Sequence, residues 1–152
     1  MVYDGNQDCI VSGYGLQAGS EAVGFWQHLA AAKLIQSPGA PRSGQIQFGS
    51  GAPASSLGGG FSVETFSNDA EGIPPGLWLI LGTARGNRGI GGLLTPAQAA
   101  AIDKKLDSGN PTTGQIRAKE GVGFQAAKCV QNDRYNLKSQ EPACVLYISI
   151  QN

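Results

Sequence analysis

Charged residues are scarce in this chain. Only 14% of its 152 residues are Asp, Glu, Lys or Arg, against about 25% in an average soluble domain. The 11 basic and 11 acidic residues balance, so the sequence offers no positive excess for binding nucleic acid or an anionic membrane surface. Because 41% of the residues are hydrophobic, the low charge does not indicate disorder.

Long apolar runs are also missing. No run approaches the roughly 18 residues that a membrane-spanning helix needs, and residues 2–6 lack the charged-then-apolar order of a targeting segment. A chain of 152 residues is long enough to bury one hydrophobic core. The sequence therefore predicts a single globular domain over residues 1–152.

Histidine occurs once, at position 28. A catalytic histidine needs a nucleophile or a carboxylate beside it, yet the residues three and four positions from His28 are glycine, alanine and phenylalanine. One histidine and a distant pair of cysteines do not form a zinc site. We therefore interpret His28 as a helix-surface or packing residue and expect neither an enzyme nor a cofactor. A small hydrolase with an unrecognised site is a competing hypothesis.

Nucleotide-binding and nucleophile motifs are absent as well. Residues 86–91 are glycine-rich but follow neither the dinucleotide-binding nor the P-loop order of glycines. Ser55 and Ser56 lack the flanking glycines of a nucleophile elbow. We predict that residues 86–91 form a surface loop.

Glycine and proline, by contrast, are abundant. The 23 glycines and 8 prolines make up about a fifth of the chain, where about 12% is usual. They concentrate in residues 36–60 and 82–92, and such clusters are typical of loops. We expect two long, irregular surface loops there.

Two helices are predicted. The first runs from Glu21 to Ile35, with Ser20 as its N-cap and with apolar residues, including Trp26, spaced along one face. We expect Pro38-Gly39 to stop it. The second helix begins with the strongest local signal in the chain, in which Thr95 is the N-cap, Pro96 takes the first helical position and Gln98 completes a capping box, and Gly109 ends it. We assign its charged residues to the solvent-facing side: Asp103, Lys104, Lys105 and Asp107.

Four segments have the composition of strands. Residues 61–66 and 114–118 mix β-branched or aromatic residues with polar ones. Residues 77–81 are continuously apolar, which is typical of a strand covered on both faces, and residues 144–150 predict an inner strand. Because helices and strands do not alternate, the sequence favours an α+β fold with an antiparallel sheet.

Three cysteines are present. Cys129 and Cys144 flank a polar segment near the C-terminus, and this arrangement in a small, glycine-rich chain favours a disulfide and an oxidising compartment. Closing a loop of that size stabilises a fold by about 3 kcal/mol in the chain-entropy model. Two unlinked, buried thiols are the alternative. Cys9 is then a leftover thiol, for which we consider a buried position.

A short acidic pattern near the N-terminus resembles half of a calcium loop. Asp4, Asn6 and Asp8 have the D-x-N-x-D spacing of an EF-hand. The pattern then fails, because Cys9 replaces the loop glycine and Gly15 replaces the terminal glutamate. The competing interpretation is a turn in which the Asp and Asn side chains bind nearby backbone groups.

A succession of sequence blocks resembles the globular domain of type IV pilin-like proteins, which include minor pilins and type II secretion pseudopilins. The blocks cover nearly the whole chain in the family's order, and their succession is more specific than any one of them. They are residues 4–8, 21–35 with Phe25-Trp26-Gln27-His28-Leu29, 53–60, 94–99, 102–111, 114–118, Cys129, 135–137 and Cys144.

The resemblance implies a structural role. Family members carry an N-terminal leader and a hydrophobic helix that anchors the precursor in the inner membrane, facing the periplasm, and then packs into a filament core. By this likeness the chain is a subunit of an extracellular or periplasmic pilus or pseudopilus in a bacterium. Other subunits would be its partners, and the membrane contact would come only from that helix. The Cys129–Cys144 segment matches the family's disulfide-bounded surface loop. The alternative is a secreted or periplasmic binding module, such as an adhesin-like head, that does not polymerise.

Overall fold

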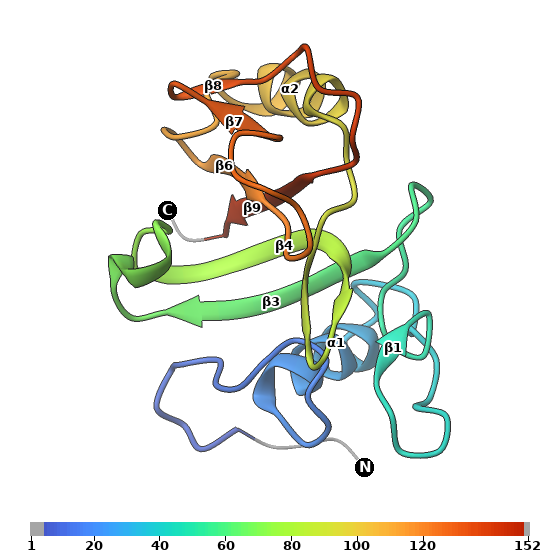
Figure 1. Cartoon of the computed structure of the whole chain (residues 1–152). Coiled ribbons are helices and arrows are strands. Elements are labelled where there is room, and N and C mark those ends of the chain that lie inside the picture. The colour runs from blue at the N-terminus through green and yellow to red at the C-terminus, as the bar shows by residue number, and fades with distance from the viewer. Residues whose placement is uncertain (1–4, 151–152) are drawn as a thin grey trace.

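The computed structural model describes residues 5–150 of the chain (Figure 1). An antiparallel sheet lies at its centre, one helix packs near the N-terminal part and another near the C-terminal part. The elements in chain order are α1 (Glu21–Ala31), β1 (Gln47–Phe48), β2 (Gly51–Ala52), β3 (Gly60–Phe66), a 3-10 turn (Asp69–Glu71), β4 (Gly76–Arg85), β5 (Arg88–Gly91), α2 (Pro96–Leu106), β6 (Ile116–Glu120), β7 (Val130–Gln131), β8 (Arg134–Tyr135) and β9 (Cys144–Ser149).

The central sheet confirms the expected α+β class. Its strand order is β3-β4-β9-β6, β5 pairs with the far end of β4, and every pairing among these strands is antiparallel. The last strand of the chain, β9, lies between β4 and β6. The apolar run at the C-terminus is therefore an inner strand, as predicted.

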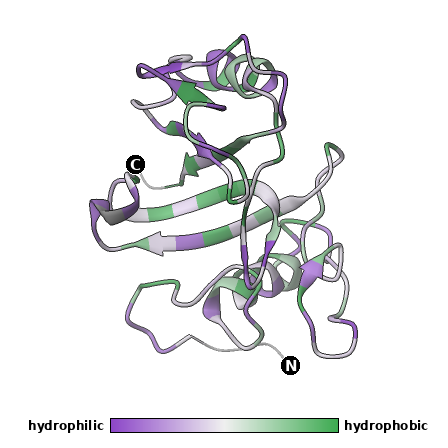
Figure 2. Cartoon of the chain, in the orientation of Figure 1, coloured by the Kyte–Doolittle hydropathy of each residue, from purple (hydrophilic) through white to green (hydrophobic). Residues whose placement is uncertain are grey.

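Both helices pack on one face of this sheet. Cross-strand pairing places Val63 opposite Leu79, and Leu81 opposite Leu146, so these side chains share a face. Trp26 of α1 lies in the same apolar cluster as Val63, and α2 contributes Ala99 to the cluster around Leu146. Figure 2 shows the corresponding hydrophobic colouring along β4 and β9.

The opposite face is covered by segments without helices. Trp78, Ile80 and Tyr147 point there and pack with Ile73 from the loop before β4 and Ile90 from β5. Successive side chains of β4 point to opposite faces of the sheet, and both faces are covered over residues 77–81, where every residue is apolar. This confirms the expected two-sided burial.

A charged cluster crosses the helix-free face. Arg88 donates to the buried Glu64 carboxylate at 3.0 Å and to Glu71 at 3.1 Å, and its guanidinium stacks 5.0 Å from the ring centre of Tyr14. Desolvation raises the pKa of Glu64 even though Arg88 opposes the shift. Burial alone would lower the pKa of Arg88, yet the two carboxylates raise it above its ordinary value. The cluster therefore joins β3, β5 and the 3-10 turn.

Helix α1 begins as expected but ends early. The Ser20 hydroxyl accepts a hydrogen bond from the Val23 N–H at 3.2 Å and caps the helix. The helix ends at Ala31, so the predicted end at residue 35 and the stop at residues 38–39 are wrong. Lys33 is left-handed, with φ 59°. Its N–H and that of Leu34 each bind a carbonyl of the last helical turn at 3.0 Å, which forms a Schellman cap without the usual glycine.

Helix α2 confirms the predicted capping box. Thr95 Oγ1 accepts from the Gln98 N–H, and Gln98 Oε1 accepts from the Thr95 N–H. The helix ends at Leu106, three residues before Gly109. One assignment on this helix is wrong: Asp103 is 0% exposed and does not lie on the solvent-facing side. It is i+4 from the buried Ala99, so it faces the core.

The two glycine-rich loops are more ordered than expected. Residues 36–60 contain β1 and β2, and the Ser50 hydroxyl holds the segment by donating to the Ala40 carbonyl and accepting from the Arg42 N–H. Residues 82–92 are largely a hairpin of β4 and β5. A Cβ at Gly82 would lie 2.4 Å from the Gly89 carbonyl oxygen, so glycine there permits close pairing of two strands.

Within residues 5–150, neither helix could cross a membrane: each has 11 residues, and no helix is long and apolar enough.

Candidate functional site

The residues that the sequence singled out fall into two groups: Asn6, Asp8, Cys9 and His28 line one groove beside α1, whereas residues 86–91, Ser55 and Ser56 lie elsewhere. His28 lies exposed in the last turn of α1. Residues 86–91 form the turn and second strand of the β4–β5 hairpin rather than a phosphate cradle. Ser55 and Ser56 belong to a turn before β3 in which Ser55 Oγ accepts from the Leu57 N–H. Each of these sets lies on a separate element.

The acidic N-terminal pattern forms local hydrogen bonds. Asn6 Oδ1 accepts from the Asp8 N–H at 3.1 Å, and Asp8 Oδ1 accepts from the Ile10 N–H at 2.8 Å. Asp4, the first residue of the proposed calcium set, lies outside the described residues. In the part of the chain that the structure describes, no group of three or more His, Cys, Asp or Glu residues is arranged to hold a metal ion.

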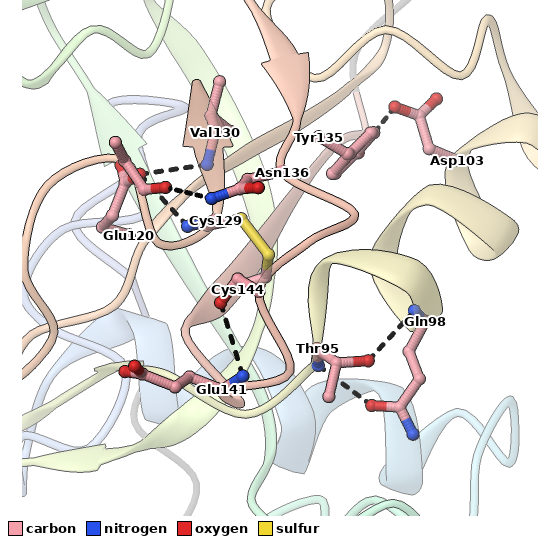
Figure 3. Close-up of a disulfide and its surroundings, with 12 residues drawn as sticks. Thr95, Gln98, Asp103, Glu120, Cys129, Val130, Tyr135, Asn136, Glu141 and Cys144 are labelled. Atoms are coloured by element: carbon pink, nitrogen blue, oxygen red, sulfur yellow. Dashed lines mark hydrogen bonds between the residues drawn. A yellow bond between two sulfur atoms is a disulfide. The ribbon is translucent and has the colours of Figure 1, made fainter.

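The predicted disulfide is confirmed, and it organises the C-terminal part of the domain. Cys129 and Cys144 are bonded with their Cα atoms 5.0 Å apart, and neither residue is exposed. Figure 3 shows the bond joining the base of β7 to the first residue of β9. We call residues 129–144 the disulfide segment. The bond ties this segment covalently to a central strand of the sheet.

Hydrogen bonds fix the start of the disulfide segment. The Glu120 carboxylate at the end of β6 accepts from the Cys129 and Val130 N–H groups at 3.3 and 3.0 Å (Figure 3). Asn136 returns from the other side of the hairpin, where its N–H donates to the Cys129 carbonyl and its side-chain amide donates to Ala127. The segment is therefore held to β6 as well as to β9.

A third attachment joins the disulfide segment to α2. The Tyr135 hydroxyl donates to the buried Asp103 carboxylate at 2.7 Å (Figure 3), and the second Asp103 oxygen accepts from the Gly109 N–H at 2.9 Å. Burial, and then the Asp103 carboxylate, raise the pKa of Tyr135 far above its ordinary value, so the hydroxyl remains a donor. Helical spacing places Asp103 on the face of the buried Ala99, a signal in the sequence that the assignment to the solvent-facing side overlooked.

The outer end of the disulfide segment is a tight hairpin. Asn132 and Asp133 both have positive φ, 51° and 58°, which is the geometry of a type I′ turn between β7 and β8. The four residues from Gln131 to Arg134 are exposed. Leu137, just beyond the hairpin, is 66% exposed. The anchored base therefore presents a polar tip and one apolar side chain to the surroundings.

A groove lies at the other end of the domain, between residues 5–11 and α1. Its volume is about 440 Å³, and apolar side chains of Ile10, Phe25 and Leu29 contribute to its lining. We call it the N-terminal groove. Cys9 also lines it and is exposed, so the buried position considered for this thiol is wrong.

Together these features define an α+β domain with a C-terminal segment that a disulfide closes onto the sheet. No protein-family model matches the chain, and no curated protein or solved structure is measurably similar to it. The resemblance to type IV pilin-like proteins stays a hypothesis that rests on the sequence blocks alone.

Proposed function

We propose that this chain is the globular domain of a type IV pilin-like structural subunit, displayed on the surface of a pilus or of a secretion pseudopilus. In this function the domain performs no chemistry on a substrate. It supplies contacts with neighbouring subunits and a surface for outside partners. A hydrophobic helix preceding the domain, which the family resemblance implies, would anchor the precursor in the inner membrane and later form the filament core.

The disulfide segment is the observation that carries this proposal. A domain displayed outside the cell has to stay folded in an oxidising environment, where a disulfide can form and can stabilise the fold. Cys129–Cys144 closes a loop with a sequence separation of 15, which stabilises the fold by about 3 kcal/mol in the chain-entropy model. Disulfides persist in the periplasm and outside the cell, which supports a periplasmic or extracellular location.

The three attachments of this segment support a display role. The segment is joined to β9 by the disulfide, to β6 through Glu120 and to α2 through Tyr135. Recognition residues are commonly placed on loops held by a rigid scaffold. The disulfide segment has the same arrangement, because its base is anchored to the sheet and to α2 while its hairpin tip is exposed.

The proposal is tested by asking whether the natural protein sediments with filaments. An epitope tag is inserted at Gly44, an exposed turn residue with open space around it. Filaments are sheared from the cells, sedimented and probed for the tag. We expect the tagged protein in the filament pellet, and its loss from the pellet when the gene for the major subunit is deleted.

The opposite result would contradict the proposal. If the tagged protein appears in the medium or periplasm and never sediments, a non-polymerising binding module is the better interpretation. A variant in which Cys129 and Cys144 are both replaced by alanine serves as a control, because loss of the disulfide should lower its abundance in every fraction rather than change how it sediments.

A further inference from the structure

The N-terminal groove combines an apolar floor with negative charge. Phe25 and Leu29 of α1 lie against Ile10 and Val11 from the N-terminal segment. Ile10 is 53% exposed, an unusually open position for isoleucine. A groove of this kind fits a partner segment with an apolar side chain at its centre.

Two carboxylates form the charged wall of the groove. Glu21 accepts from the Ser12 hydroxyl and N–H and from the Asn6 N–H, and these bonds lower its pKa. Asp8 accepts from the Ile10 N–H and from the Asn6 side chain. Among the described residues, no lysine or arginine lines the groove. The two carboxylates are held by hydrogen-bond donors, and the imidazole of His28 lines the groove beside them.

The opposite end of the domain carries the complementary pattern. Leu106 at the end of α2 is 65% exposed, and Leu137 after β8 is 66% exposed. Four exposed cations accompany these two leucines. Two carboxylates lie at the same end: Asp133 is exposed, and Asp107 is partly buried and accepts from the Gln115 and Ile116 N–H groups. We call the set the basic end, and it consists of Lys104, Lys105, Leu106, Arg134, Leu137 and Lys138.

The two surfaces lie at opposite ends of the molecule. In Figure 1 the N-terminal segment and α1 lie at the bottom, whereas α2 and β8 lie at the top. Different, complementary patches can engage different copies at the same time, and such a contact continues as an open chain instead of closing into a dimer.

From this arrangement we propose that the basic end of one copy of this chain docks into the N-terminal groove of the next copy. Leu106 and its lysine neighbours enter the groove, with Asp8 and Glu21 facing the lysines. Opposite charges steer such encounters, and the contact weakens as salt rises. The inference rests on the proposed function, because it names the contact through which neighbouring subunits of the filament would meet.

Cys9 makes the contact measurable. It lines the groove and is the free thiol of the chain, whereas Cys129 and Cys144 are fully buried in their disulfide. In a Leu106→Cys variant, a short bismaleimide should join Cys9 of one copy to residue 106 of the next. The native chain offers one thiol and can give dimers only, so we expect a ladder of trimers and larger species in the variant.

Leu57→Cys is the matched control, because Leu57 is 54% exposed but lies in the turn before β3, outside the basic end. We expect about fivefold more ladder from Leu106→Cys than from Leu57→Cys, a difference within the range of a few weak contacts. Equal ladders would overturn the inference.

Charge reversal tests the pairing itself. In the Leu106→Cys background, Lys104→Glu with Lys105→Glu should reduce the ladder to the control level, and adding Asp8→Lys should restore part of it. Arg42→Glu with Arg85→Glu makes the same change of net charge elsewhere and should leave the ladder intact. An unchanged ladder after the lysine reversals would overturn the inference, as would an equal loss from the arginine reversals.

Failure here and failure of the proposed function are separable. If the tagged protein sediments with filaments while the ladder is absent, the docking contact is wrong and the filament role stands. If the ladder forms while the protein never sediments, the copies associate by this contact outside a pilus-like filament.

Discussion

The hydrogen bond between Tyr135 and Asp103 gives the sharpest test of how the C-terminal part is held together. Tyr135→Phe removes the hydroxyl and keeps the ring, which is only 9% exposed and so retains its packing. The change leaves one oxygen of a fully buried carboxylate without the donor that lies 2.7 Å away. An orphaned buried acceptor costs about 1–3 kcal/mol, so we expect a loss of about 2 kcal/mol in the free energy of unfolding.

The assay is urea unfolding with the disulfide intact, read as a fall in the midpoint at constant slope. In a domain of this size the same loss lowers the melting temperature by about 4–8 °C. Tyr14→Phe is the matched control, because Tyr14 is 44% exposed and removing its hydroxyl should change stability by less than about 0.5 kcal/mol. Equal losses for the two variants would refute the reasoning.

Asp103→Asn probes the same bond from the acceptor side. The two Asp103 oxygens accept from different donors, Tyr135 and Gly109, whereas an asparagine amide offers only one oxygen. We expect a larger loss than in Tyr135→Phe. The double variant should lose less than the sum of the single losses, by about 1–2 kcal/mol, because both changes remove one shared interaction. Additive losses would show that the two residues act independently.

The same bond predicts a dependence on alkaline pH. Burial and Asp103 raise the pKa of Tyr135 in the folded protein, while the unfolded chain ionises near the ordinary value of 10.0. A raised folded pKa contributes stability that is complete below the unfolded pKa and is lost as the pH rises above it. The wild-type protein should therefore lose stability above about pH 10, and Tyr135→Phe should lose it less steeply. Identical slopes would contradict this assignment.

Three further predictions address other parts of the molecule. Trp26→Ala should cost roughly 3–5 kcal/mol of unfolding free energy, because the ring is only 6% exposed and packs between α1 and the sheet. His28→Ala should cost little, because His28 is exposed. Calorimetry measures both losses. Replacing Cys129 and Cys144 by alanine should lower stability by about 3 kcal/mol, and, because the bond is buried, a reductant should not cleave it below the unfolding transition. Glu21→Gln should flatten the loss of stability below about pH 4.5, because a lowered folded pKa contributes stability present above the unfolded value of 4.5 and lost as the pH falls.

The features that the sequence predicted correctly depend on residues close together in the chain or on overall composition. The start of α2 depends on Thr95, Pro96 and Gln98, which lie within four positions of one another, and the structure has the predicted cap. The strand at residues 77–81 and the inner position of β9 follow from apolar content that leaves no other placement in a small domain. The disulfide followed from composition and spacing.

What the sequence did not predict depends on contacts between distant segments. Helical spacing gives the face of Asp103, but its hydroxyl partner Tyr135 lies 32 residues away, and no local pattern predicts that pairing. The early end of α1 depends on a lysine in the left-handed region, where glycine is the usual signal. The glycines of residues 82–92 indicate loops when considered locally, yet Gly82 and Gly91 permit the close pairing of β4 and β5.

The residues that stabilise the fold and the residues of the two proposed contact surfaces are largely different, and this supports the proposed function. Stability is concentrated in the middle of the domain, where both helices cover one face of the sheet and the Arg88 cluster joins strands on the other. The N-terminal groove and the basic end combine surface residues of these two helices with residues 5–11 and with the disulfide segment. Substitutions at the exposed Asp8, Lys104 or Lys105 should change association without unfolding the domain, whereas a change at Tyr135 should act on both, because Tyr135 joins the disulfide segment to α2. A domain whose stability and contact surfaces are separable in this way can vary its ends while its core stays fixed.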